Sequence, residues 1–191
     1  MKKIAKLLLV FCMFLGVLGF TGETLAATNK EIPTEDFVTG GQLTDLNGVV
    51  KEWFGYYDAL LVRYDFNFAD AYEVNSGDTL TIQLPNELSV GNMTFDLKAT
   101  DALNEEATIG TATVNKTDKT ITITFNDYFE AKTGRSGYFY IGAYWDRDVI
   151  DELTKYELQF VKDGETQTVN VGKKSTVDRN EMLAKWGSQD S

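Results

Sequence analysis

Residues 76–85, with the sequence SGDTLTIQLP, place the tightest constraint on what this chain can fold into. Aliphatic and polar side chains alternate over this stretch, so a period of two puts them on opposite faces. Such alternation is typical of a half-buried antiparallel strand. Ser76-Gly77-Asp78 supplies turn-forming residues in front, and Pro85 behind lacks the amide needed to continue a central ladder. We expect the other alternating segments to be partners of this strand.

The same alternation recurs along most of the chain between turn-forming residues. Asn47-Gly48 and Asp163-Gly164 predict tight turns inside two hairpins. Strands are predicted over residues 42–45, 49–53, 60–68, 79–84, 93–99, 107–114, 121–125, 137–146, 156–161 and 166–171, and short helical turns over residues 126–133 and 146–153. About ten short strands without a long helical period predict an all-β antiparallel sandwich.

The first 26 residues are predicted to be an export signal. Three lysines precede an apolar run over residues 7–20, and Thr24-Leu25-Ala26 places small residues where a signal peptidase cleaves. A retained membrane anchor is the less favoured alternative, because the run is shorter than the roughly 20 residues that a span needs. Cleavage after Ala26 removes three lysines, Glu23 and Cys12, and no membrane insertion is expected of the mature chain.

The composition of the mature chain excludes several classes of function. It holds 15 basic and 28 acidic side chains, a net charge of −13, and neither histidine nor cysteine. The acidic balance argues against nucleic acid and anionic membrane surfaces, which attract basic patches. Without histidine or cysteine, the chain can form no Ser-His-Asp or Cys-His triad, no HExxH motif and no cysteine-based zinc site. We expect no catalytic residues, metal or cofactor.

Three ordered segments carry a resemblance to a known family. They are Tyr64-Asp65-Phe66 ahead of GDTLTIQLPNEL (residues 77–88), ITITFNDYFE (residues 121–130) and GYFYIGAYWD (residues 137–146). At this spacing they resemble the first of two tandem Ig-like domains in Gram-positive surface adhesins of the serine-aspartate-repeat, clumping-factor and collagen-adhesin type. The resemblance covers residues 42–171 and implies an Ig-like antiparallel β-sandwich.

The resemblance also implies a function and a set of partners. In that family the paired domains bind a host matrix or plasma protein, often an extended peptide clamped between them and latched by a strand. It implies a secreted or surface-displayed adhesin module that is not an enzyme, with a second Ig-like domain as partner if the chain is a fragment. The chain holds no LPxTG sorting motif, so wall attachment would need one downstream of Ser191. The alternative is a structural Ig-like stalk that projects another binding domain.

The domain organisation expected from these features has four parts. They are a signal peptide over residues 1–26, a polar leader over 27–41, an Ig-like domain over 42–172, and a linker or the start of a missing second domain over 173–191. In the last part Asp178 and Glu181 match a capping box, and Met182, Leu183 and Trp186 have helical spacing. These residues predict a short helix that either folds back on the sandwich or leads into a second domain.

The candidate ligand-binding residues are three tyrosines on the strand predicted over residues 137–146. Tyr138, Tyr140 and Tyr144 share one face of it, and the opposite face is apolar. Exposed tyrosines are common anchors for peptide or glycan ligands, because they bring a large contact area at low entropic cost. The alternative is a central strand whose two faces are covered by the sheet and by a neighbouring domain.

Two further clusters have simpler explanations. Asp146, Asp148, Asp151 and Glu152 offer oxygens to calcium but do not follow the D-x-D-x-D-G loop, so a solvated acidic loop is favoured. An internal crosslink between a lysine and an asparagine would need both residues buried beside an acid. Lys51 and Asn170 are the one pair that we consider for it, and an exposed lysine is the default.

Overall fold

The computed structural model describes residues 29–69, 72–100, 105–130 and 135–172, so the predicted signal peptide and tail helix lie outside the described residues. Eleven strands and two short 3₁₀ helices lie within these ranges. In chain order they are η1 (Thr34–Asp36), β1 (Val38–Thr44), β2 (Trp53–Phe54), β3 (Ala59–Phe68), β4 (Thr79–Gln83), β5 (Leu88–Val90), β6 (Met93–Thr100), β7 (Glu106–Asn115), β8 (Thr120–Phe125), η2 (Asp127–Glu130), β9 (Arg135–Trp145), β10 (Lys155–Gln159) and β11 (Thr166–Val171).

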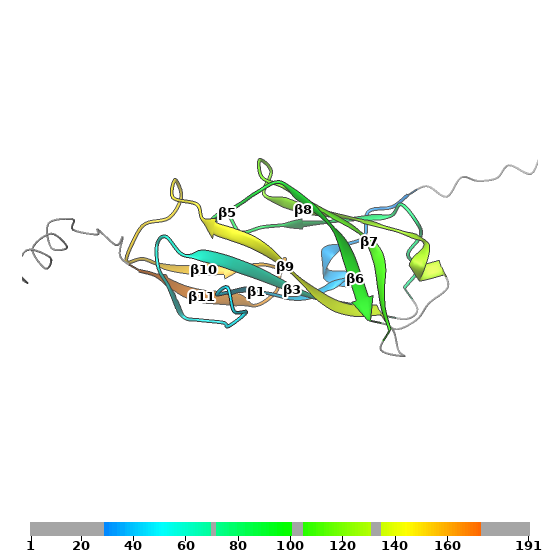
Figure 1. Ribbon diagram of the computed structural model, residues 1–191, viewed down its shortest axis with the longest axis horizontal. Coiled ribbons are helices and arrows are strands. Elements are labelled where there is room, and N and C mark those ends of the chain that lie inside the picture. The colour runs from blue at the N-terminus through cyan, green and yellow to red at the C-terminus, as the bar shows by residue number, and fades with distance from the viewer. Residues whose placement is uncertain (1–28, 70–71, 101–104, 131–134, 173–191) are drawn as a thin grey trace, which may run out of the picture.

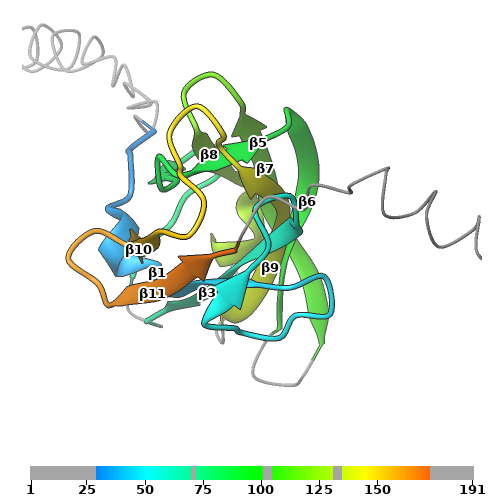
Figure 2. The ribbon, with the colours of Figure 1, turned by 90° about the vertical axis from the view of Figure 1, so that its left-hand side faces the viewer.

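The strands form two sheets around one core. Seven strands of the large sheet follow the order β1-β3-β9-β6-β7-β8-β4, and β5 pairs with β9 beside this path. The three remaining strands follow the order β10-β11-β2. Viewed from one end, the large sheet curls so that β6, β7 and β8 lie across the core from β1 and β3, with the small sheet beside β1 (Figure 2). The predicted antiparallel sandwich is confirmed.

The alternating stretch that the sequence singles out forms β4. Leu80, Ile82 and Leu84 are buried, and Gly77 adopts a left-handed φ of 89° in the preceding turn. β4 lies at the edge of the large sheet, where β8 is its strand partner. Pro85 ends the strand as predicted, but β4 is not a central strand of the sheet. β9 has more partners, because it pairs with β3 over residues 135–144 and with β5 and β6 on its other side.

The stretch predicted as a polar leader is part of the fold from residue 29 onward. Ile32 and Phe37 are fully buried, and the Ile32 amide donates to the Thr79 carbonyl at 2.7 Å. The Thr79 amide in turn donates to the Lys30 carbonyl at 2.9 Å, so residues 30–32 lie alongside the start of β4 in parallel. Two isolated apolar side chains among polar ones give little periodicity, which is why the sequence did not reveal this segment.

The hairpin predicted around Asn47-Gly48 is correct in its turn and wrong in its pairing. Gly48 has the left-handed φ of 76° that such a turn requires, and the Asp45 amide donates to the Val49 carbonyl at 2.9 Å. Beyond an isolated bridge between Thr44 and Val50, the returning segment leaves β1. It forms β2 instead, which pairs in parallel with β11 in the small sheet, and β1 pairs with β3.

A buried phenol in the core gives a test of stability. Tyr64 is fully buried, its ring stacks on Phe139 at a centroid distance of 5.4 Å, and its hydroxyl has no hydrogen-bond partner among the described residues. An unsatisfied buried polar atom costs about 1–3 kcal/mol. We expect Tyr64→Phe to raise the unfolding free energy in urea by about 1 kcal/mol, and a loss of stability would contradict an unpaired hydroxyl.

Candidate functional site

The three predicted tyrosines lie on the outer face of β9. Tyr138 and Tyr144 are 57% and 58% exposed, and Tyr140 is partly buried. The alternate residues of β9 point into the core, where Phe139, Ile141, Ala143 and Trp145 are buried. The predicted division into a tyrosine face and an apolar face is therefore confirmed. Within the described residues the outer face is open to solvent.

An arginine that the sequence analysis missed joins this face from β3. The Arg63 guanidinium carbon lies 4.5 Å from the ring centroid of Tyr138 and 5.9 Å from that of Tyr140, which are cation–π distances. Asp65 binds Arg63 through both carboxylate oxygens, with an Nη2–Oδ1 distance of 2.6 Å. This hydrogen bond raises the pKa of Arg63 above its ordinary value. We call Arg63, Asp65, Tyr138, Tyr140 and Tyr144 the tyrosine–arginine face.

The sheet opens along one side of β9. β5 pairs with β9 only at residues 143–145, and β6 pairs with it only at Ser136. Residues 137–142 therefore have a strand partner on the β3 side alone within the described chain. The Asp146 amide donates to the Glu87 carbonyl on the open side, and alternate residues bond to opposite neighbours. The backbone groups of Tyr138, Tyr140 and Gly142 thus point into this opening, which we call the β5–β6 gap.

A hollow of about 350 Å³ lies where β6 diverges from β9. Phe95 of β6 and Phe139 of β9 contribute to its wall, with ring centroids 5.8 Å apart. Lys98 and Glu106 also line it and form an exposed ion pair at 2.7 Å. An apolar side chain could pack on the rings while its backbone follows β9. The arrangement suits an extended polypeptide.

The turn after β1 reaches the tyrosine–arginine face. The Tyr140 hydroxyl lies 3.1 Å from where a Cβ on Gly48 would stand. Asp45 organises this turn, because its carboxylate accepts hydrogen bonds from the Asn47 and Val49 amides at 2.9 and 3.0 Å and pairs with Lys51 at 2.6 Å. Together these contacts lower the pKa of Asp45 from 3.8 to about 2, and the hydrogen bond with Lys51 has the largest effect.

The Asp45 turn should respond to acid. A carboxylate whose pKa is lowered by folding stabilises the fold above its ordinary pKa and loses that contribution as pH falls through the lowered pKa. We expect the turn to loosen between pH 4 and about 2. Amide chemical shifts of Asn47 and Gly48, followed by NMR, should report this transition, and Asp45→Asn should abolish it. Shifts that titrate near pH 3.8 instead would contradict the structure.

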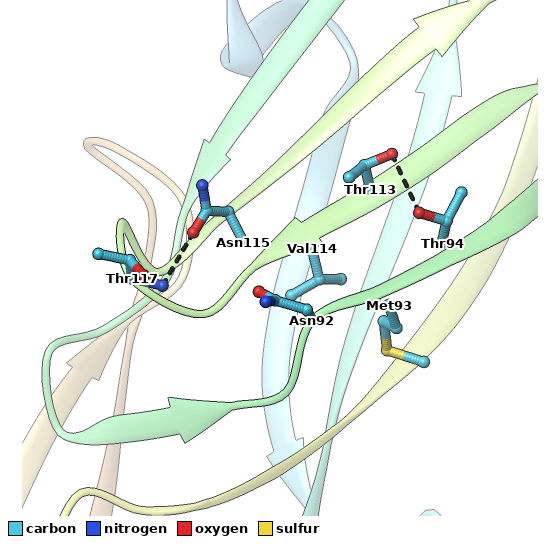
Figure 3. A pocket seen from close by; sticks show the side chains of 7 residues that line it. All are labelled: Asn92, Met93, Thr94, Thr113, Val114, Asn115 and Thr117. Atoms are coloured by element: carbon cyan, nitrogen blue, oxygen red, sulfur yellow. Dashed lines mark hydrogen bonds between the residues drawn. The ribbon is translucent and has the colours of Figure 1, made fainter.

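A second hollow lies on the other half of the large sheet and has a different character (Figure 3). It has a volume of about 560 Å³ and is lined by Asn92, Met93, Thr94, Thr113, Val114, Asn115 and Thr117. The hydroxyls of Thr94 and Thr113 point toward each other at 3.4 Å, and the Asn115 side chain accepts from the Thr117 amide at 2.8 Å (Figure 3). Its lining holds no aromatic or charged side chain, so we do not place the site there.

The two other clusters considered from the sequence do not form sites. Asp146 pairs with Lys119 at 2.7 Å, which lowers its pKa, and no group of acidic residues within the described ranges could hold a metal ion. Lys51 is exposed and bound to Asp45, whereas the exposed Asn170 donates to the Glu52 carbonyl at 3.0 Å. The geometry that an internal crosslink needs is therefore not present between Lys51 and Asn170. None of the described helices is long and apolar enough to cross a membrane.

The fold, with its open strand edge, places this protein in the class of Ig-like domains built from curled antiparallel sheets. A family model for the bacterial Ig domain matches residues 54–155, more than half of the chain. The chain belongs to the bacterial Ig domain family. Two solved structures share the fold. A serine-rich repeat protein from Streptococcus agalactiae matches with a TM-score of 0.54 and 14% identity, over 77% of this chain and 48% of that one. The collagen adhesin from Staphylococcus aureus matches with a TM-score of 0.51 and 18% identity, over 79% of this chain and 47% of that one.

Curated relatives are Gram-positive surface proteins. The chain is 28% identical over 130 residues to the wall-associated protein of Streptococcus mutans and 29% identical over 132 residues to serine-aspartate repeat-containing protein E of Staphylococcus aureus. These matches cover 68% and 66% of this chain but only 28% and 11% of those proteins. A fibrinogen-binding protein of Staphylococcus epidermidis is 28% identical over 149 residues, 76% of this chain and 13% of that one. The predicted resemblance to adhesins is confirmed, and the family is non-enzymatic.

Proposed function

We propose that this chain is a surface-displayed adhesin module that binds a host matrix or plasma protein. The observation that carries the proposal is the β5–β6 gap, where β9 lacks a strand partner over residues 137–142 beside the tyrosine–arginine face. The relatives support it, because one is named for fibrinogen binding and a structural neighbour is a collagen adhesin.

The ligand is an extended segment that adds to β9 as a strand. Main-chain hydrogen bonds to Tyr138, Tyr140 and Gly142 supply an affinity that does not depend on sequence, and the neighbouring side chains supply specificity. The hollow at Phe95 takes an apolar ligand side chain. Tyr138 and Tyr144 lie beside the gap and provide rigid aromatic contacts, and the ion pair with Asp65 keeps Arg63 on the Tyr138 ring. A second Ig-like domain would supply another wall.

Binding experiments test separately whether the chain binds a host protein and whether the tyrosines of β9 take part. The mature chain, and any longer product of the gene, would be assayed against fibrinogen, collagen, fibronectin and keratin peptides. We expect Tyr138→Ala with Tyr144→Ala to weaken binding by about thirtyfold or more, because exposed aromatic anchors are common hot spots. Thr124→Ala, an exposed change on β8, is the control and should bind normally.

N-methylated peptides test the backbone contacts. Methylation at alternate amides removes the donors that strand addition uses, so it should abolish binding, whereas methylation of the intervening amides should not. Equal affinity for both methylated peptides would exclude strand addition in the gap. If no ligand bound either the mature chain or a longer product of the gene, the adhesin proposal itself would be overturned.

A stalk that projects another binding domain is the second candidate. The described chain starts at one end of the long axis, and β11 finishes at the other (Figure 1). A domain with this geometry extends an assembly by its own length. Such a role needs no ligand, so it would be favoured if the tyrosine variants and the whole ligand panel gave no signal.

A further inference from the structure

Four large apolar side chains are exposed at the end of the molecule where β11 finishes. They belong to residues 53–57, which include β2, and to the loop over residues 146–154, which Figure 1 shows at the same end as β10 and β11. We call them the apolar pole: Trp53 (58% exposed), Tyr57 (52%), Val149 (48%) and Leu153 (73%). Arg147 links the two segments, because its guanidinium carbon lies 5.3 Å from the Tyr57 ring.

Leu153 adopts a backbone conformation that leucine rarely takes. Its φ is 56°, in the left-handed region that favours glycine or asparagine, and a bulky residue is strained there. Its amide donates to the Val171 carbonyl at 3.0 Å, which holds the strained turn against the last strand. The Leu153 side chain, in contrast to its amide, is largely exposed within the described fold. Its side chain therefore points to an additional contact.

Trp53 marks the path by which the chain leaves the domain. β2 pairs in parallel with the end of β11, so Trp53 lies opposite Asn170. The Gly172 amide donates to the Phe54 carbonyl at 2.6 Å, and a Cβ on Gly172 would collide with the Trp53 ring. Whatever follows residue 172 therefore starts beside the apolar pole.

We propose that residues 178–186 dock on the apolar pole as a short amphipathic helix. Met182, Leu183 and Trp186 would share the buried face at helical spacing, after the capping box of Asp178 and Glu181. The five residues between Gly172 and Asp178 span at most about 18 Å, enough to bring a helix of about 14 Å back over the same end.

Charge favours the same occupant. Residues 173–186 carry four basic and two acidic side chains, a net positive segment in a strongly acidic chain. The loop over residues 146–153 carries four acidic side chains and one basic. One of the acids, Asp146, is already paired with Lys119, and two of the others, Asp148 and Asp151, are exposed near the pole. A basic helix on an acidic rim with an apolar centre is complementary in both respects.

An engineered disulfide tests the docking directly, because the mature chain has no cysteine of its own. We expect the mature variant with Leu153→Cys and Leu183→Cys to form an intramolecular disulfide completely under mild oxidation, as measured by mass spectrometry and thiol counting. The control pairs Leu183→Cys with Asp127→Cys, an exposed residue of η2 at the opposite end of the molecule. Equal oxidation of the two pairs, or none of either, would overturn the proposal.

A mutant cycle in the full mature chain, measured by melting temperature, gives a second readout. Leu153→Gly relieves the left-handed backbone but removes the apolar contact. With the tail intact we expect it to lower the melting temperature. With Leu183→Ser and Trp186→Ser already present, no contact is left to lose, and the same change should raise it. A rise of equal size in both backgrounds would show that the tail does not cover Leu153, and a following domain or a second copy would then be the occupant.

Discussion

Phe37→Ala is expected to lower the free energy of unfolding by about 3–5 kcal/mol, because it empties the centre of an aromatic cluster. Phe37 is fully buried, and its ring lies 4.6 Å from Phe66, 4.5 Å from Phe68 and 5.5 Å from Phe125. These three rings come from β3 and β8, on both halves of the curled sheet. They are fixed by their own strands, so the surroundings cannot collapse into the cavity.

Urea unfolding of the mature chain measures this effect, and Glu35→Ala provides the control. Glu35 is exposed in η1, two residues before Phe37, so its replacement should change stability by less than about 0.5 kcal/mol. If Phe37→Ala were as mild as Glu35→Ala, residues 29–37 would be a dispensable leader after all. The pair of variants therefore tests the largest difference between the sequence-based domain boundary and the structure.

Gly110→Ala is expected to destabilise the fold by about 3 kcal/mol, because a single methyl group would meet backbone. Gly110 lies in β7 next to a bulge, where the register with β6 shifts between Leu97 and Lys98. A Cβ at Gly110 would overlap the Thr124 carbonyl oxygen of β8. A side chain can rotate away from such a clash, but a carbonyl inside a paired strand cannot, so β7 and β8 would have to separate.

The same substitution at Gly142 is the matched control. Gly142 also lies in a strand of the large sheet, but no atom lies within 4 Å of where its Cβ would stand. Gly142→Ala should therefore leave the melting temperature within about 2 °C of the wild type. A destabilisation as large as that of Gly110→Ala would mean that loss of glycine itself, rather than the clash with β8, is responsible.

The strands could be predicted because burial of one face places an apolar residue at every second position of the sequence. β3, β4 and β8 follow this alternation closely, and the three tyrosines of β9 fall on the face that the alternation assigns to them. Which strands pair with each other has no such local signature in the sequence. The partner of β2 is β11, more than a hundred residues away, and only the closed core selects it over the adjacent β1.

The site was predictable in part for the same reason. Alternation placed Tyr138 and Tyr144 on an outer face, but it could not place Arg63 beside them, since that contact depends on the β3–β9 register. The β5–β6 gap was also hidden, because a missing strand partner is a property of the whole topology. Residues 29–37 were hidden because the apolar contacts of Ile32 and Phe37 are too few to form a period.

The two parallel pairings have a mechanical consequence. Residues 30–32 run alongside β4 where the described chain begins, and β11 runs alongside β2 where it ends, at the opposite pole of the long axis (Figure 1). Inter-strand hydrogen bonds lie across the chain direction, so tension applied through the termini would load each set in shear and rupture it as a unit rather than one bond at a time. Pulled from its two ends, the domain would therefore resist as long as either set of hydrogen bonds holds intact.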